Sequence, residues 1–152
     1  MYLRISKITL IIIYQIGITT DDITSNTHSY NLENIPAYTG KSFVTINNNV
    51  PFFEENDFTE EAFEKYSKLD KQGRCGVAFA NVCVDIMPKE GEKRESISNI
   101  KNLSGWVQKE YPNIIGTRYL YNRCHLIGWQ LSAENANIQN LMTGTAYLNY
   151  AM

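Results

Sequence analysis

Residues Tyr121 to Asn149 read "YNRCHLIGWQLSAENANIQNLMTGTAYLN", and this stretch decides the fold. Its first residues predict a strand that ends near His125, and "LMTGT" predicts a second short strand or extended turn. A short helical or irregular stretch and an Asn-rich loop lie between them. A helix is expected to begin near Thr145, whose hydroxyl can cap it. This order of strand, loop, strand and helix can bring Asn149 on the helix to His125, which precedes it by 24 residues.

The residue types in this stretch suit metal-assisted hydrolysis of a phosphodiester. A neutral imidazole such as that of His125 is apt as a general base near pH 7. Magnesium prefers oxygen ligands and keeps several waters, so the carbonyl of Asn149 plus phosphate oxygens can anchor it. Arg123 would add a bidentate clamp on a phosphate. The same residue types also allow a structural His125 and an Asn149 that only caps or pairs locally.

Length and composition bound the class of protein. The chain has 152 residues, which suits one domain, and with 43% hydrophobic and 20% charged residues it can bury a core. A nucleic-acid binder is often strongly basic, so the net charge of −2 argues mildly against this class. Residues 54–70 hold seven acidic residues and two lysines, whereas residues 89–125 hold seven Lys or Arg and four Glu. This asymmetry allows an anion-attracting face, and two ordinary solvated faces are the alternative.

The N-terminal residues have the pattern of a secretory signal. Arg4 and Lys7 precede an apolar stretch from Ile8 to Ile18, which is shorter than the roughly 20 residues of a membrane span. We predict that residues 1–20 are a signal peptide, that the mature protein begins after Thr19, and that it is secreted. An uncleaved anchor that holds the protein at the cell surface, or a buried strand, is the alternative. Residues 21–34 are polar and predict a linker.

Upstream of the deciding stretch, the sequence predicts further elements. Residues 42–53, "SFVTINNNVPFF", predict two strands around an Asn turn. Residues 57–69, "DFTEEAFEKYSKL", predict a helix that Asp57 caps, with Glu60 completing a capping box. Residues 77–87, "VAFANVCVDIM", predict an apolar strand ended by Pro88, and a polar loop follows it.

The spacing of Cys75, Cys83 and Cys124 does not resemble a zinc site. Export would permit one disulfide among them, and the sequence does not indicate which pair would form it.

The stretch "YLYNRCHLIGWQLSAENANIQNLMTGTAYLN" resembles the signature of the DNA/RNA non-specific endonucleases of the ββα-metal superfamily. It is most similar to the streptococcal-type secreted DNases and DNA-entry nucleases. The segments "IPAYTGKSFVTINNNVPFF", "FEKYSKLDKQGRCGVAFANV" and "DIMPKEGEKRESISNIKNLSGW" resemble the same family, so the resemblance runs from about Ile35 to Met152. The family's Asp-Arg-Gly-His tetrad corresponds to Asn122-Arg123-Cys124-His125, in which the Asp and Gly positions differ.

The resemblance implies an α+β, ββα-metal nuclease fold with a central antiparallel sheet over residues 35–152. It implies His125 and Arg123 as catalytic residues, and Asn149 as the ligand of Mg²⁺ or, alternatively, Mn²⁺. The substrate would be DNA, with RNA as a second candidate. We predict that Arg94, Arg118 and Asn140 contact the nucleic acid, although Arg94 can also hold a solvated loop and Asn140 can shape its own loop.

Family members continue beyond the metal-binding asparagine with a supporting acidic residue and further strands, whereas Met152 follows Asn149 by three residues. The resemblance therefore implies a nuclease domain that is truncated after the metal-binding helix. The main expectation is a metal-dependent endonuclease. An inactive remnant that at most binds nucleic acid is the alternative, and a toxin domain is a third interpretation for which the sequence offers no delivery module.

Overall fold

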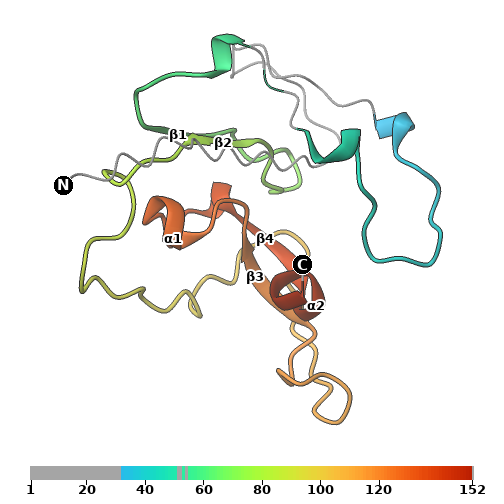
Figure 1. The fold of residues 1–152 in the computed structure, drawn as a ribbon. Helices are drawn as coiled ribbons and strands as arrows, with labels where there is room; N and C mark the ends of the chain where they lie inside the picture. The colour runs from blue at the N-terminus through green and yellow to red at the C-terminus, as the bar shows by residue number, and fades with distance from the viewer. Residues whose placement is uncertain (1–31, 51–52, 54, 152) are drawn as a thin grey trace.

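The structure, a computed structural model, describes residues 32–50, 53 and 55–151. The predicted signal segment, residues 1–20, lies outside these residues, as do residues 21–31 of the predicted linker. The described chain combines short helices with antiparallel strands, which confirms the α+β class (Figure 1). The strands are β1 (Phe63–Tyr66), β2 (Ala78–Asn81), β3 (Tyr121–His125) and β4 (Leu141–Thr145), the α-helices are α1 (Trp129–Ser132) and α2 (Ala146–Ala151), and the 3-10 helices are η1 (Leu32–Asn34), η2 (Asn47–Asn49), η3 (Glu55–Asp57) and η4 (Ile138–Asn140).

The strands of the described residues form two separate antiparallel hairpins. Strand β1 pairs with β2, with Phe63 opposite Asn81. Strand β3 pairs with β4, with Tyr121 opposite Thr145 and His125 opposite Leu141. The predicted antiparallel pairing is confirmed, but the expected central sheet is divided into two sheets of two strands each.

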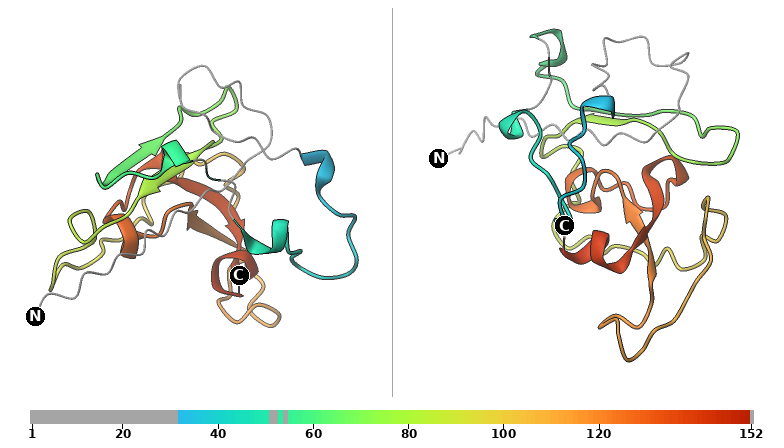
Figure 2. Two further views of the ribbon diagram at one scale, coloured as in Figure 1. Left: turned by 45° about the horizontal axis from the view of Figure 1, so that its top comes forward. Right: turned by 90° about the vertical axis from the view of Figure 1, so that its right-hand side faces the viewer.

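The predicted order of strand, loop, strand and helix is confirmed in β3, β4 and α2. The chain passes from β3 through α1 and η4 to β4, and then directly into α2. The hydroxyl of Thr145 accepts a hydrogen bond from the backbone N–H of Leu148 at 3.1 Å, so Thr145 caps the helix as predicted. Helix α2 packs against both strands of the hairpin (Figure 2).

A close approach at Gly144 lets α2 pack on the hairpin. A Cβ atom at this position would lie 2.6 Å from the Sγ of Cys124 and 2.9 Å from a methyl group of Leu148. Cys124 is buried on β3, and Leu148 belongs to α2. A larger residue at this position would therefore force the side chain of Cys124 or Leu148 to shift.

The hydrophobic core joins the two hairpins. Its buried residues come from β2, from the segment just before it, and from the residues that follow β3. Half-buried side chains from β1, α1 and β4 pack against it. The buried members are Cys75, Ala78, Ala80, Leu126 and Ile127, and the packed neighbours are Tyr66, Leu69, Val82, Leu131 and Met142.

The predicted helix over residues 57–69 is wrong, because the middle of this stretch forms β1. Asp57 lies in η3 rather than at a helix cap, and the hydroxyl of Thr59 accepts a hydrogen bond from the N–H of Glu61. Pairing with β2 overrides the local helix signal, and it brings the rings of Phe63 and Phe79 to 5.0 Å between centroids. Burial across a hairpin therefore outweighs the capping box.

Two predicted strand assignments also need correction. Residues 42–50 and 53 contain no strand, and the three asparagines of η2 all adopt positive φ, which forms a tight turn. The strand predicted over residues 77–87 is reduced to β2, which ends at Asn81. The amide of Asn81 donates to the carbonyls of Thr59 and Glu61 at 2.6 and 2.7 Å, so it ties the end of the strand to the chain before β1.

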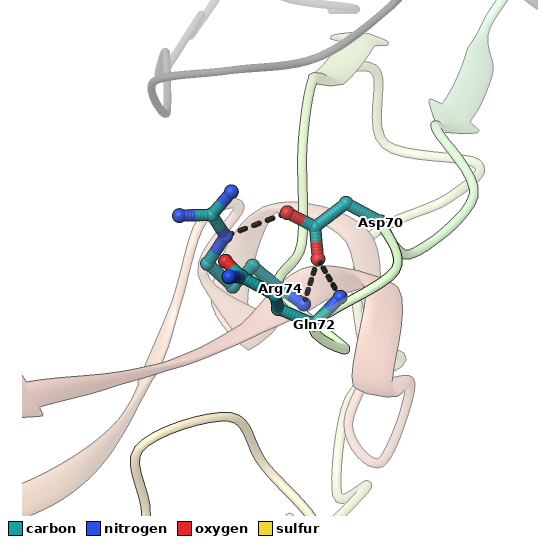
Figure 3. A network of polar contacts seen from close by, with 3 residues as sticks. All are labelled: Asp70, Gln72 and Arg74. Carbon is teal, nitrogen blue, oxygen red and sulfur yellow. Dashed lines mark hydrogen bonds and ion pairs between the residues drawn. The ribbon is translucent and has the colours of Figure 1, made fainter.

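A polar network closes the turn between β1 and β2 (Figure 3). The carboxylate of Asp70 accepts hydrogen bonds from the backbone N–H groups of Gln72 and Arg74, each at 2.8 Å, and from the Nε of Arg74 at 2.6 Å. These donors lower the pKa of Asp70, with the backbone N–H of Arg74 contributing most. Gly73 completes the turn with a φ of +72°.

The structure places no disulfide among Cys75, Cys83 and Cys124. Within the described residues, no helix has the length and apolar character that a membrane crossing requires.

We expect Gly144→Ala to lower the free energy of unfolding by about 1–3 kcal/mol, because the added methyl group must displace Cys124 or Leu148. Urea denaturation followed by circular dichroism measures this change. Gly116→Ala is the control, since a Cβ there meets nothing within 4 Å, and it should change stability by less than about 0.5 kcal/mol. Equal stability of the two variants would contradict the packing described here.

Candidate functional site

His125 occupies the last position of β3 and is half-buried. Its Nε2 lies 2.8 Å from the backbone carbonyl oxygen of Asn135, in the loop after α1. Its Nδ1 lies 3.3 Å from the Nη2 of Arg94, which comes from the long loop between β2 and β3. The imidazole is therefore held between a carbonyl and a guanidinium, from two segments far apart in the sequence.

These two contacts determine the tautomer of the ring. A guanidinium has only N–H donors, so Nδ1 of His125 must accept from Arg94. A carbonyl oxygen has only lone pairs, so Nε2 must carry the proton and donate it to Asn135. The only tautomer that satisfies both partners is neutral, with the lone pair of Nδ1 accepting from Arg94. Nδ1 can take a proton from a water molecule once that water replaces the Arg94 N–H as its hydrogen-bond partner.

The surroundings favour the neutral form of His125. Burial lowers the pKa of His125, and the positive charge of Arg94 lowers it further. The hydrogen bond to the Asn135 carbonyl and the carboxylate of Glu134 act in the opposite direction, with a smaller combined effect. The pKa of His125 therefore lies below the 6.5 of an unperturbed imidazole, and the ring is uncharged at neutral pH.

Arg94 is the predicted substrate residue that lies next to His125. Its side chain is exposed, and its Nε donates to the Oδ1 of Asn135 at 3.0 Å. The contacts with Asn135 and His125 engage one N–H on Nε and one on Nη2. A guanidinium has five N–H donors, so three remain for a phosphate.

Arg123 has a different environment from the one predicted. Its Nε donates to the carbonyl of Ile100 at 2.5 Å, and its Nη2 donates to the carbonyl of Ser98 at 3.0 Å. The guanidinium carbon lies 3.9 Å from the ring centroid of Trp106, in a cation–π contact. Partial burial lowers the pKa of Arg123. These contacts anchor the loop before β3, and they argue against the predicted bidentate clamp on a phosphate.

Arg118 lies away from His125. It precedes β3, whose five residues span roughly 15 Å, and His125 is at the other end of that strand. Its Nη2 and Nε bind the carboxylate of Glu110 at 2.8 and 2.9 Å. The segment that carries this ion pair projects away from both hairpins (Figures 1 and 2). The structure therefore does not bring Arg118 to the candidate base.

Asn140 is fully buried, with 0% of its surface exposed. Its Oδ1 accepts from the backbone N–H of Ile127 at 2.8 Å, and its Nδ2 donates to the carbonyl of the same residue at 3.0 Å. The predicted contact with nucleic acid is contradicted by this geometry, because the side chain is inaccessible and its amide is already paired. The alternative prediction, that Asn140 shapes its loop, agrees with the structure.

Asn149 lies on α2, and its side chain is exposed. Its approach to His125 stays a prediction. Among the described residues, no group of three His, Cys, Asp or Glu side chains could hold a metal ion. A site for magnesium built from one exposed amide oxygen, waters and phosphate oxygens remains compatible with this donor set, because that ion keeps several waters.

The sequence reasoning missed Asn135, which contacts both His125 and Arg94. The Asn-rich loop was recognised, but three asparagines occupy it, and residue type does not distinguish their partners. One of them, Asn137, accepts a hydrogen bond from the N–H of Gln139 and so caps η4. The contact to His125 uses a backbone carbonyl, which any residue type would supply.

Comparison with known proteins gives two findings. A sequence model of the DNA/RNA non-specific endonuclease family matches residues 54–152. The solved structure of the nuclease NucA from Streptococcus agalactiae with magnesium ion bound is similar, with 25% sequence identity and a TM-score of 0.53. The similarity covers 68% of this chain and 46% of NucA, so the chain spans about half the length of that nuclease. Comparison with curated proteins gives no significant match.

We expect Asn140→Ala to lower the free energy of unfolding by at least about 2 kcal/mol, because each unpaired buried backbone group of Ile127 costs about 1–3 kcal/mol. Thermal and urea denaturation measure the loss. Asn149→Ala, which truncates an exposed amide, should stay within about 0.5 kcal/mol of wild type without metal. A stable Asn140→Ala protein would show that the buried amide does not hold the fold.

Proposed function

Because the chain belongs to the family of DNA/RNA non-specific endonucleases, we propose that it hydrolyses phosphodiester bonds in DNA, and in RNA as a second substrate. The observation that carries the proposal is the environment of His125. A carbonyl orients the neutral ring, and the lone pair of Nδ1 lies beside an exposed arginine. A base next to a phosphate-binding cation is what attack by water on a phosphodiester requires.

In the proposed reaction, a water molecule replaces the Nη2 of Arg94 as the hydrogen-bond partner of Nδ1 of His125. Nδ1 then removes a proton from this water while the water oxygen forms a bond to phosphorus. The bond between phosphorus and the leaving oxygen breaks, and that oxygen takes a proton from the solvent. The N–H groups of Arg94 that Asn135 does not engage bind phosphate oxygens and offset the charge that develops there. Nε2 keeps its proton and donates a hydrogen bond to the Asn135 carbonyl throughout, so the ring does not rotate.

Asn149 would hold a magnesium ion, with Mn²⁺ as the alternative. When bound, the ion would neutralise charge on the phosphate and on the leaving oxygen. Three observations support this assignment: the exposure of Asn149, the packing of α2 on the hairpin that carries His125, and the magnesium ion in NucA. The donor set of one amide oxygen fits an ion that keeps most of its waters.

We also propose that the protein acts outside the cell or at its surface. The support is the basic and then apolar N-terminal sequence, residues 1–20. Fusion of these residues to a reporter enzyme that is active only after export tests this. An unexported reporter would contradict the proposal.

We expect the wild-type chain to nick plasmid DNA with Mg²⁺, and His125→Ala to lose about 10²–10⁴ of the rate, because the base is removed. Asn149→Ala should also lose cleavage, with partial recovery in excess Mg²⁺, since the lost interaction is metal affinity. Gel assays with plasmid DNA, structured RNA and either Mg²⁺ or Mn²⁺ measure these effects. DNA binding by the wild-type chain without cleavage would favour the inactive remnant instead.

Substitution of Arg94 and substitution of Arg123 should affect different properties of the protein. Arg94→Ala should weaken DNA binding in EDTA and lower the slope of log K against log salt by about 0.9, which corresponds to one phosphate contact. Arg123→Ala should leave that slope unchanged and lower the free energy of unfolding by about 1–3 kcal/mol, because it loses two carbonyl partners and the Trp106 ring. Fluorescence anisotropy and denaturation measure the two quantities. A lower salt slope in Arg123→Ala, with an unchanged slope in Arg94→Ala, would instead assign the phosphate contact to Arg123.

A further inference from the structure

Asn135 contacts both members of the candidate catalytic pair. Its backbone carbonyl accepts from the Nε2 of His125 at 2.8 Å, and its side-chain Oδ1 accepts from the Nε of Arg94 at 3.0 Å. Its Nδ2 donates to the backbone carbonyl of Glu95 at 3.0 Å. One half-buried residue therefore connects the end of β3 with a loop about 40 positions earlier in the chain.

Arg94 needs such an anchor because it lies in an exposed loop without helix or strand. A free arginine side chain loses conformational entropy when it is fixed in one position. The bond from Nε to Asn135 fixes the plane of the guanidinium, and the bond from Asn135 to Glu95 fixes the backbone beside it. Both bonds come from the same amide group, so the loop and the side chain are positioned together.

The other asparagines of this region make contacts of a different kind. Asn137 bonds to Gln139, two residues away, and Asn140 bonds to the backbone of Ile127. Both contacts shape the segment between β3 and β4 and do not involve Arg94. Asn135 alone of these three asparagines bonds to the arginine beside the candidate base.

We propose that Asn135 is a positioning residue that holds Arg94 and His125 at a fixed spacing, so that one phosphate can meet the guanidinium while its attacking water meets Nδ1. This inference rests on the proposed nuclease function and adds to it a residue that touches neither the water nor the phosphate. Its side chain acts through Arg94, and its backbone acts through His125. The two actions can be separated, because a side-chain substitution leaves the carbonyl in place.

The test is a double-mutant cycle of Asn135→Ala and Arg94→Ala, with kcat and KM measured on duplex DNA. Asn135→Ala should lower kcat/KM by about 10- to 100-fold, since misplacement of a catalytic group by about 1 Å has effects of this size. The double variant should be no worse than Arg94→Ala alone, because Asn135 acts through that arginine. Additive losses would overturn the proposal.

Asn137→Ala is the matched control, since it removes an amide from the same loop without touching Arg94. It should keep kcat/KM within about twofold of wild type, and a tenfold loss would show that general loosening of the loop explains the effect. Asn135→Asp keeps an acceptor for the Nε of Arg94 but loses the donor to Glu95. It should recover part of the activity that Asn135→Ala loses, and no recovery would contradict the role of Oδ1.

Nuclear magnetic resonance of the imidazole supplies a readout that does not depend on cleavage. In Asn135→Ala the ring of His125 should keep its proton on Nε2, because the backbone carbonyl remains. Its pKa should rise towards that of Arg94→Ala, because the charge that lowers it is no longer held in place, while Glu134 continues to raise it. An unchanged pKa in Asn135→Ala would show that Arg94 keeps its position without the amide.

Failure of the proposed function gives a distinct result. A wild-type chain that does not cut DNA, or a His125→Ala variant with undiminished activity, would overturn the nuclease mechanism, and the positioning role would fall with it. An active wild type and an inactive His125→Ala, combined with additive losses in the cycle, would overturn the role of Asn135 alone.

Discussion

The buried amide of Asn140 is the contact on which the geometry of the site depends. The side-chain amide pairs with the backbone N–H and carbonyl of Ile127. The backbone carbonyl of Asn140 accepts a hydrogen bond from the N–H of Leu126 at 2.9 Å. The segment from Ile127 to Asn140 is thereby closed into a loop at the end of the β3–β4 hairpin. Asn135 lies on this loop, so its carbonyl reaches back to His125. Without the closure, the candidate base would have no fixed partner for Nε2.

Arg94 and Arg123 hold the same long loop at two places, yet their surroundings suit them to different tasks. Arg123 is partly buried, and its guanidinium is engaged by two carbonyls and an aromatic ring. Releasing it to bind a phosphate would leave those carbonyls unpaired, at about 1–3 kcal/mol for each one that is buried. Arg94 is exposed, and after its two contacts it retains donors. The arginine that a nucleic acid can reach at low energetic cost is therefore Arg94.

The sequence predicted best where the determining contacts are local. The strand ending at His125, the helix capped by Thr145 and the turn at the three asparagines follow from short patterns of residue type, and all are present. The helix predicted around Phe63 was wrong because a local helix signal competes with pairing to β2, and the sequence alone does not show which of the two is stronger. The surroundings of Arg123 were not predictable for a related reason, since backbone carbonyls that belong to a distant loop leave no pattern in residue type.

The charge of Arg94 has opposite consequences for a base in the free protein and in a complex with substrate. Beside the lone pair of Nδ1 this charge lowers the pKa of His125, which keeps the ring neutral but also makes Nδ1 a weaker base. A phosphate bound to Arg94 would offset that charge and add its own negative potential near the ring. The basicity of Nδ1 would then rise when a substrate is present and a water needs to be deprotonated. In the proposed mechanism, an exposed arginine held 3.3 Å from the base would therefore couple phosphate binding to base strength.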